Sequence, residues 1–487
     1  MKNNRGGQSP FIATLWSLIE KFSSEIIGFI IGIVLARLLS PHDYGVVGLT
    51  VIFIAYSSVF IESGFTNALI RKTDRSDNDL STAFFFNVFI GIVCYIFLFV
   101  FSPYIAIFFD EPVLETLIRV ISINVFLNSL CIVQIAILSA DLNIRLLTII
   151  NLCGQIPGGV IAIYLAYYGF GVYSLVIQQV SSLLIRTILL WIFAKWRPQK
   201  FVFDGESFKY LWNFGSKMLL SGLIGATFDQ IHSVLIGKYI GKNELGYYSK
   251  GRGLSDHVTS INTGIVQKVV IPILARCQTN IDVLKANFRE MMKLLTMFVS
   301  PIAAFCVYAA RDIILFLWTD KWLQTVPMFQ LIVCCIVLGP IGALSLSLLQ
   351  VVNRTDIILK IEILKKTIFA IVILISFQFG IYALLIGQIF NNILAALVNM
   401  YPTKNILRYN YFEQLIDIFK YVLYSYFVGA ISFLIPDTGS YFINIILIFV
   451  SIGILYPLFL WFLKDELFLQ YAYKFKNTVL LCQKRMN

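Results

Sequence analysis

The sequence predicts an all-α polytopic membrane protein with about 14 transmembrane helices. Apolar residues make up 58% of its 487 residues and charged residues only 13%, whereas a soluble chain carries about 25% charge. The apolar runs are long and continuous. They therefore favour membrane-spanning helices over a β-barrel, whose strands are segments of about ten residues with alternating polarity.

Fourteen apolar segments are each long enough to cross a bilayer, because about 20 helical residues span its hydrocarbon core. The eighth is unusually polar, since it contains Asp256, His257 and Lys268. Twelve spans are the alternative, if the region 414–463 does not cross. The predicted spans are 12–38, 44–70, 83–109, 113–139, 145–168, 171–194, 208–238, 246–275, 285–311, 324–351, 356–378, 380–402, 414–435 and 440–463.

Lysine and arginine are concentrated in the connections on one side of these spans. Examples are the segments 71–75 and 195–209 and the tail after residue 463. Short cytoplasmic loops carry such an excess of positive charge, so both termini are predicted to be cytoplasmic, with tails at 1–11 and 464–487. This topology accounts for the net charge of +11, and no nucleic-acid partner is expected.

An internal repeat divides the chain. Residues 171–180 (GVYSLVIQQV) match residues 380–389 (GIYALLIGQI), and residues 35–45 (LARLLSPHDYG) correspond to residues 236–246 (IGKYIGKNELG). Six spans separate the copies, so both insert in the same orientation, as in a parallel repeat about an axis normal to the membrane. The expected parts are an N-lobe at 12–194, a cytoplasmic linker at 195–207, a C-lobe at 208–402 and two added helices within 403–463.

No catalytic motif is found in the sequence. It lacks a P-loop, a GxSxG elbow, an HExxH pair and a glycine-rich dinucleotide turn, so the protein is not expected to be an enzyme. Its eight cysteines show no metal-ligand spacing, and no metal or cofactor is predicted. Without an ATP site, energised transport would use an ion gradient or the substrate's own gradient.

Charged residues inside the predicted spans are the candidate site. Each costs at least about 2.5–3.5 kcal/mol at the centre of a bilayer, so it is expected to face a hydrophilic cavity between the lobes. Lys21, Ser24, Glu25, Gly28 and Gly32 share one helical stripe, and Lys217, Ser221, Gly225 and Asp229 form a second. The substrate-binding candidates are Lys21, Lys217, Lys268 and Arg119, and the ion-coupling candidates are Glu25, Asp229 and Glu62.

Two simpler interpretations of these charges stay open. Lys21 and Glu25 are four residues apart and could neutralise each other as a helical pair. Arg186, Lys365 and Lys366 lie near predicted cytoplasmic ends, where a long side chain can extend to the lipid headgroups.

Several segments resemble one transporter family over residues 12 to about 400. The chain is similar to Wzx-type lipopolysaccharide and exopolysaccharide flippases, in the polysaccharide-exporter family of the multidrug/oligosaccharidyl-lipid/polysaccharide exporter superfamily. Its segment 254–258 (LSDHV) lacks the proline expected there. The matching segments are LARLLSPHDYG (35–45), SGFTNALIRK (63–72), DNDLSTAFFFN (77–87), LGYYSKGRGL (245–254), VVIPILARCQTN (269–280) and LFLWTDKW (315–322).

The resemblance implies two six-helix lobes and alternating access in the bacterial inner membrane, with coupling to H⁺ or Na⁺. The implied substrate is a polyprenyl-diphosphate-linked oligosaccharide, moved from the cytoplasmic to the periplasmic leaflet for lipopolysaccharide, capsule or exopolysaccharide synthesis. The implied partners are membrane lipids and the glycan polymerase and glycosyltransferases. Two alternatives are a cation-coupled multidrug exporter of the same fold and a non-transporting scaffold of a glycan-synthesis complex.

Overall fold

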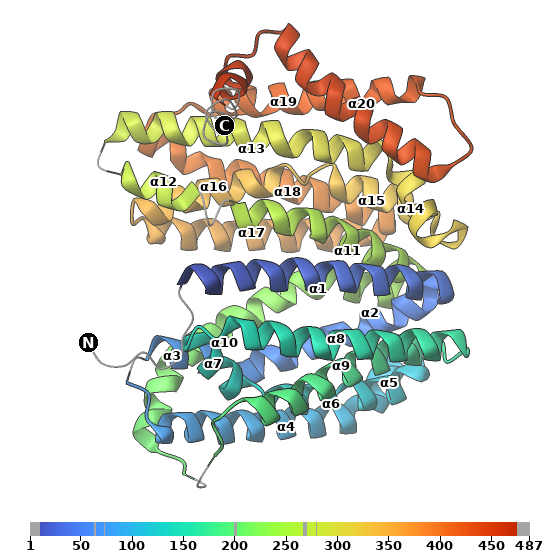
Figure 1. Ribbon diagram of the computed structural model, residues 1–487, viewed down its shortest axis with the longest axis vertical. Coiled ribbons are helices and arrows are strands. Elements are labelled where there is room, and N and C mark those ends of the chain that lie inside the picture. The colour runs from blue at the N-terminus through green and yellow to red at the C-terminus, as the bar shows by residue number, and fades with distance from the viewer. Residues whose placement is uncertain are drawn as a thin grey trace, which may run out of the picture. The chain divides into compact units, whose positions relative to one another are not determined.

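The computed structural model describes residues 10–62, 65–72, 74–198, 202–265, 270–278 and 280–474, and their regular structure is helical. The chain forms two compact units, one up to Ser249 and one from Lys250 (Figure 1). Each unit holds its own helix bundle.

The N-terminal unit is built around α8, which packs along α9 on one side and α1 on the other. Helix α2 contacts α4, α5, α6, α9 and α10. A buried aromatic and aliphatic cluster joins α3, α4, α7 and α10, with Phe65, Phe84 and Leu211 among its members. The helices are α1 (Pro10–Leu38), α2 (Pro41–Glu62), α3 (Phe65–Arg71), α4 (Asp77–Phe109), α5 (Val113–Ile121), α6 (Ile123–Ser129), α7 (Ile132–Ala140), α8 (Ile144–Tyr167), α9 (Val172–Phe193), α10 (Gly205–Leu235) and η1 (Ile236–Ile240).

Glycines allow α8 to approach both of its neighbours. A Cβ on Gly158 would lie 1.9 Å from Ser182 Oγ of α9, and a Cβ on Gly159 would lie 2.1 Å from Ile31 Cδ1 of α1. Gly154 meets Ser182 one turn earlier. Small residues four apart allow close packing of membrane helices. As a result, the polar residues of α8 lie against α1 and α9.

The C-terminal unit contains two helix groups. Helix α18 packs against α16 and α17, while α13, α19 and α20 form the second group around the buried side chains Met297, Tyr421 and Tyr456. Helix α11 (Lys242–Ile265) begins in the N-terminal unit and ends in this one. The others are α12 (Ile271–Arg276), α13 (Ile281–Tyr308), α14 (Ala310–Trp318), η3 (Asp320–Trp322), α15 (Thr325–Val333), α16 (Leu338–Val351), α17 (Thr355–Ser376), η4 (Phe377–Phe379), α18 (Ile381–Leu407), α19 (Tyr411–Ile431), η5 (Ser432–Leu434) and α20 (Tyr441–Phe462).

The all-α membrane fold is confirmed, although the number of spans is not. In the part of the chain that the structure describes, ten helices are long and apolar enough to cross a membrane, or eleven if one bent pair is a single span. Helices α1, α11 and α17 coincide with three further predicted spans but are not among these ten or eleven. That fourteen segments cross therefore stays a prediction.

The predicted span 113–139 is a broken helix. Its two parts, Val113–Ser129 and Ile132–Ala140, meet at an angle of 42°. The hydroxyls of Ser122 and Ser129 donate to the carbonyls of Arg119 and Phe126, at 2.9 and 2.7 Å. Serine bonds of this kind compete with the regular helical pattern and often bend a helix. The sequence showed the apolar length of this segment but not the break.

The boundary between the compact units falls after Ser249, whereas the repeat predicts a lobe boundary at 195–207. Helix α10 belongs to the N-terminal unit because it packs on α2, α3 and α4. Tyr56 OH of α2 donates to Thr227 Oγ1 of α10 at 2.7 Å, and the amide of Asp204 donates to Thr82 Oγ1 at 3.0 Å. The lobes at 12–194 and 208–402 stay a prediction from the repeat.

Candidate functional site

A polar cavity of about 450 Å³ lies within the N-terminal unit. Five helices contribute to it, and most of its lining side chains are amides or hydroxyls. Such a concentration of polar groups inside a membrane helix bundle marks a candidate binding site. The lining residues are Ser24 of α1, Ile54 and Ser58 of α2, Asn124, Val125 and Asn128 of α6, Asn151 and Gln155 of α8, and Gln179, Ser182, Leu183 and Arg186 of α9.

The α1–α8 contact fixes one wall of this cavity. Gln155 Nε2 donates to the backbone carbonyl of Ser24 at 3.0 Å. One turn earlier on α8, Asn151 Nδ2 donates to Glu20 Oε1. Gly28 leaves room for Gln155, whose Nε2 would lie 3.1 Å from an added Cβ. The face of α1 that packs on α8 therefore includes Glu20. The polar stripe predicted from the sequence did not contain this residue.

Several polar atoms at the cavity have no protein partner in the described part of the chain. Arg186 Nε, Asn124 Oδ1 and Asn151 Oδ1 are buried and form no hydrogen bond there. Buried polar atoms are normally satisfied, and each exception needs a reason, such as a bound molecule. This cavity can donate hydrogen bonds, accept them and supply one positive charge.

The C-terminal unit has a cavity of about 440 Å³ at the equivalent place of the repeat. At the offset of 209 (380 minus 171), Gln179 corresponds to Gln388, and each glutamine lines the cavity of its own unit. At the offset of 201 (236 minus 35), Ile54 and Ser58 correspond to Ser255 and Thr259, which line the second cavity. The internal repeat is therefore visible in the cavities as well as in the sequence.

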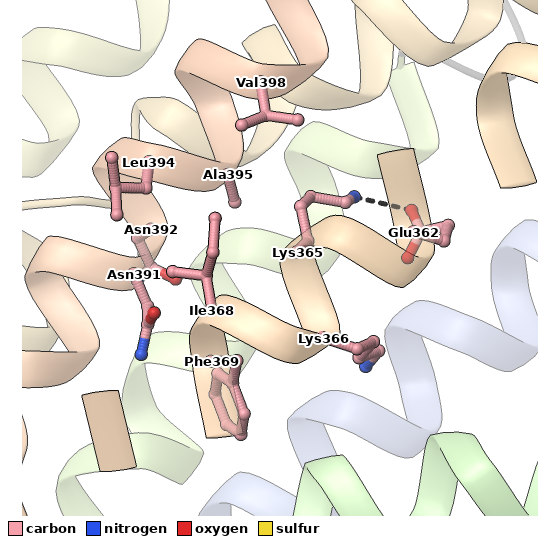
Figure 2. A pocket seen from close by; sticks show the side chains of 10 residues that line it. All are labelled: Glu362, Lys365, Lys366, Ile368, Phe369, Asn391, Asn392, Leu394, Ala395 and Val398. Atoms are coloured by element: carbon pink, nitrogen blue, oxygen red, sulfur yellow. Dashed lines mark hydrogen bonds and ion pairs between the residues drawn. The ribbon is translucent and has the colours of Figure 1, made fainter. Parts of the chain in front are cut away.

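A smaller pocket of about 160 Å³ lies between α17 and α18 of the C-terminal unit. Figure 2 shows Lys365 directed toward Glu362, and the two form an ion pair at 2.5 Å. Asn391 also lines this pocket, and its Nδ2 is buried without a partner among the described residues. Because Glu362 and Lys365 neutralise each other, the three charged residues of α17 that line this pocket give it a net charge of one positive unit.

The predicted charges on α1 and α10 are not among the residues that line the two larger cavities. Lys21 is exposed and Glu25 is partly buried, while Ser24 between them lines the N-terminal cavity. Lys217 and Asp229 are exposed on α10. Lys268 is outside the described residues. The roles of these residues in binding or ion coupling stay predictions.

The two remaining candidates have different surroundings. Arg119 pairs with Glu115 at 2.7 Å, donates to Ser102 Oγ at 3.0 Å and lies 4.8 Å from the ring centre of Phe99. These contacts already compensate its charge. Glu62 is the last residue of α2 and is exposed. Neither residue lines one of the two larger cavities.

The charge-based prediction missed the amides of the N-terminal cavity. Asn124, Asn128, Asn151, Gln155 and Gln179 carry no charge, so a search for buried charge passes over them. Their spacing was a usable signal, because Asn151 and Gln155 are four residues apart on one apolar span. Arg186 was noted in the sequence, but only as a side chain that could extend to the headgroups.

Comparisons with known proteins agree with a polysaccharide-exporter identity. Residues 34–327 match the family described as polysaccharide biosynthesis protein. The teichuronic acid biosynthesis protein TuaB of Bacillus subtilis (strain 168) is 28% identical over 60% of this chain and 62% of its own length. The succinoglycan biosynthesis transport protein ExoT of Rhizobium meliloti (strain 1021) is 24% identical over 65% of this chain and 64% of its own.

A third relative is matched over more of its length. The lipopolysaccharide biosynthesis protein WzxC of Escherichia coli (strain K12) is 22% identical over 80% of both chains. The chain thus spans less than two thirds of TuaB and ExoT but four fifths of WzxC.

Solved structures show the same fold. The lipid II flippase MurJ in an inward closed conformation superposes with a TM-score of 0.74 at 14% identity, covering 93% of this chain and all of that one. An inward-facing multidrug resistance MATE transporter of the MOP superfamily gives 0.61 at 16% identity, over 79% and 94% of the two chains. With a family match that covers more than half of its residues, the chain belongs to the polysaccharide biosynthesis protein family.

Proposed function

We propose that this protein is a flippase for lipid-linked oligosaccharides. It moves a polyprenyl-diphosphate-linked repeat unit from the cytoplasmic to the periplasmic leaflet of the bacterial inner membrane, by alternating access. The glycan and diphosphate pass along a hydrophilic path while the polyprenyl chain stays in lipid. The product supplies polysaccharide synthesis at the cell surface.

The polar cavity of the N-terminal unit is the observation that carries this proposal. Nine of its twelve lining residues are serine, asparagine, glutamine or arginine. Sugar hydroxyls both donate and accept hydrogen bonds, as do amides and serine hydroxyls. A cationic drug would instead favour carboxylates and aromatic faces, and no carboxylate or aromatic residue lines this cavity.

The relatives support the substrate class. Three of them are named for the biosynthesis of teichuronic acid, succinoglycan and lipopolysaccharide, which are different polymers. A common step in making such polymers is the movement of a precursor across the membrane. The different products suggest that the glycan varies while the transport reaction is shared.

The proposed orientation puts both termini in the cytoplasm, because the lysines and arginines of the connections are concentrated on that side. In the absence of an ATP-binding motif, transport is coupled to a gradient of H⁺ or Na⁺. Lys21 and Lys217, whose side chains are exposed on the first and seventh predicted spans, are proposed contacts of the diphosphate. Glu25 and Asp229 are proposed to take part in ion coupling.

Deletion of the gene tests the proposal. The expected result is loss of the surface glycan, together with accumulation of the lipid-linked repeat unit in the cytoplasmic leaflet. Restoring the gene on a plasmid should reverse both changes. Normal surface glycan in the deletion strain, with no accumulated precursor, would contradict the proposal.

A multidrug exporter is the second candidate, because the fold also superposes on a MATE transporter. A panel of cationic drugs applied to the same deletion strain separates the two functions. Increased drug sensitivity with an intact surface glycan would favour the exporter. A scaffold role predicts instead that substitutions inside the cavities leave glycan export unchanged.

A further inference from the structure

Arg186 gives the N-terminal cavity a positive charge that no lining carboxylate balances. The cavity lining contains no acidic residue, and Arg186 Nε is buried without a hydrogen-bond partner among the described residues. The acid hydrogen-bonded to the cavity wall is Glu20, whose Oε1 accepts from Asn151 Nδ2. Arg186 as a residue is only partly buried, but a charged group whose N–H is shielded from water is unfavourable there unless an anion or another acceptor compensates it.

The equivalent cavity shows that the fold does not require this charge. At the offset of 209, Arg186 corresponds to Ala395, which lines the C-terminal cavity. Asn124 and Asn128 correspond, at an offset of 208, to Ile332 and Ile336 of that cavity. Of the two glutamines of the N-terminal cavity, Gln179 is retained in the second copy as Gln388. Arg186 and its two asparagines are therefore an addition to the N-terminal cavity rather than a condition for forming its walls.

Charge in the second cavity is compensated within the protein. Its cation, Arg252, pairs with Asp256 of the same helix at 3.8 Å, and both residues line that cavity. The N-terminal cavity has no corresponding pair. Of these two equivalent cavities, only the N-terminal one therefore presents a lining cation with no lining acid to balance it.

The ligand that fits is an anion of low charge with several hydroxyls. Arginine binds a carboxylate through two parallel N–H···O bonds, and amides and serine hydroxyls complement ring hydroxyls. A cavity of about 450 Å³ is within the range of small-molecule sites. A diphosphate carries more negative charge than one arginine can balance, so the single cation favours a carboxylate.

We propose that the N-terminal cavity binds an acidic sugar, a hexuronate residue of the glycan, with Arg186 holding its carboxylate. Asn124, Asn151 and Ser182 bind the ring hydroxyls. That this sugar belongs to the transported glycan rests on the proposed function, whereas the binding site itself does not. Arg186 would make glycans with an acidic residue better substrates than neutral glycans of the same length.

Direct binding to the full-length protein in lipid nanodiscs tests this site. Sodium glucuronate, glucose and inorganic diphosphate are titrated separately, and the thermal unfolding midpoint is followed. We expect glucuronate to raise the midpoint and glucose to act at least tenfold more weakly. Arg186→Gln should weaken the glucuronate response at least tenfold, and Arg186→Lys should weaken it less.

Gln388→Ala is the matched control, because Gln388 lines the equivalent cavity of the C-terminal unit. It should leave the glucuronate response unchanged. An unchanged response in a folded Arg186→Gln protein would overturn the proposal, as would equal responses to glucose and glucuronate. A response to diphosphate alone that depends on Arg186 would also overturn it. If Arg186→Gln does not fold, Arg186→Lys gives the decisive comparison.

The binding result is independent of transport. Arg186-dependent glucuronate binding in a protein whose deletion leaves surface glycan intact would refute the flippase function and keep the site. Absence of such binding, with precursor accumulation in the deletion strain, would refute the site and keep the flippase function.

Discussion

Gly45 and Gly246 occupy equivalent positions of the internal repeat and meet each other backbone to backbone. A Cβ on Gly45 would lie 1.8 Å from the carbonyl oxygen of Lys242, and a Cβ on Gly246 would lie 1.9 Å from that of Pro41. Each added Cβ would also lie 3.2 Å from the amide nitrogen of the other glycine. Such a reciprocal contact is typical of a twofold relation. The starts of α2 and α11 therefore contact each other in a locally twofold manner.

Alanine at either glycine should separate these two helix starts. Backbone carbonyls cannot rotate away as a flexible side chain can, so we expect Gly45→Ala and Gly246→Ala each to destabilise the protein by about 1–3 kcal/mol. Thermal unfolding of the purified protein measures the effect. The control is Gly253→Ala on α11, where nothing lies within 4 Å of an added Cβ. Equal stability of Gly246→Ala and Gly253→Ala would contradict the predicted collision.

The sequence could predict the equivalence of Gly45 and Gly246 but not their contact. An offset shows which residues correspond, whereas proximity depends on where the axis of the repeat passes. Gln179 and Gln388 are a second pair whose equivalence, but not whose surroundings, could be predicted from the sequence. The sequence paired them, yet only packed helices could show that each lines a cavity of its own unit.

The candidate site was predictable only in part, because a search for buried charge overlooks neutral groups. Buried charge in the sequence indicated the polar stripe of α1 that contains Lys21 and Glu25. Ser24 of the same stripe does line a cavity. The sequence could not show that Glu20 is the acid that faces α8, since a helix with polar residues at neighbouring positions has two adjacent polar faces. Arg119 shows the converse, because its partner Ser102 is 17 residues away on another helix.

Lys238 and Asp110 link η1 to the end of α4 through an ion pair at 2.9 Å. The hydrogen bond and charge of Lys238 hold the pKa of the Asp110 carboxyl below its ordinary value. The pair therefore contributes fully above that ordinary value and is lost as the pH falls through the lowered pKa. We expect Lys238→Gln to speed hydrogen exchange of residues 236–240 at neutral pH, with little effect on global stability because the carboxylate is exposed.

Asp110→Asn is the partner variant for this test. Asp110 adopts a left-handed conformation at φ 52°, which asparagine also tolerates, so the variant removes the charge without new backbone strain. Its hydrogen-exchange rate over residues 236–240 should match that of Lys238→Gln. In neither variant should this rate rise further as the pH is lowered. Exchange of residues 236–240 that stays at the wild-type rate in both variants would show that the ion pair does not hold η1.

Asp417 of α19 is the common partner of Arg289 and Lys293, which lie in the first half of α13. Its carboxylate is 6% exposed and accepts from Arg289 Nε at 2.6 Å, while Lys293 Nζ lies 3.2 Å away. Replacing it leaves two neighbouring cations without their anion. Removal of one partner from a fully buried ion pair costs about 3–5 kcal/mol. Because the Arg289 side chain is 42% exposed, Asp417→Asn should cost less than this, but it should lower the unfolding midpoint clearly more than a surface substitution does.

The matched control for this cluster is Asp282→Asn, on the first turn of the same helix α13. It should have a small effect, since surface substitutions usually change stability by about 0.5 kcal/mol or less. A second variant, Arg289→Gln combined with Asp417→Asn, should recover part of the loss by removing one of the orphaned charges. Equal midpoints for Asp417→Asn and Asp282→Asn would show that α13 and α19 do not depend on the pair.

Asp465 ties the segment after α20 to α19 and makes the stability of this region depend on pH. The residue is 3% exposed and accepts from Lys420 Nζ at 2.6 Å, from Tyr421 OH at 3.2 Å and from the amide of Phe468 at 3.0 Å. Burial raises the pKa of this carboxyl. The hydrogen bonds from Lys420 and Phe468 and the charge of Lys420 lower it by more, so the pKa lies below its ordinary value. Its contribution is therefore complete at neutral pH and is lost as the pH falls through the lowered pKa.

We accordingly expect Asp465→Asn to cost about 1–3 kcal/mol at pH 7, because the carboxylate that accepts these bonds is replaced by a neutral amide. The difference from the wild type should shrink in acid, where the wild-type carboxyl is itself protonated. Thermal unfolding at neutral and acidic pH, together with the rate of proteolysis in residues 463–474, measures both effects. Glu466→Gln, at the next position of the chain, should keep the acid dependence of the wild type. An Asp465→Asn protein that loses stability in acid as steeply as the wild type would show that another group controls the transition.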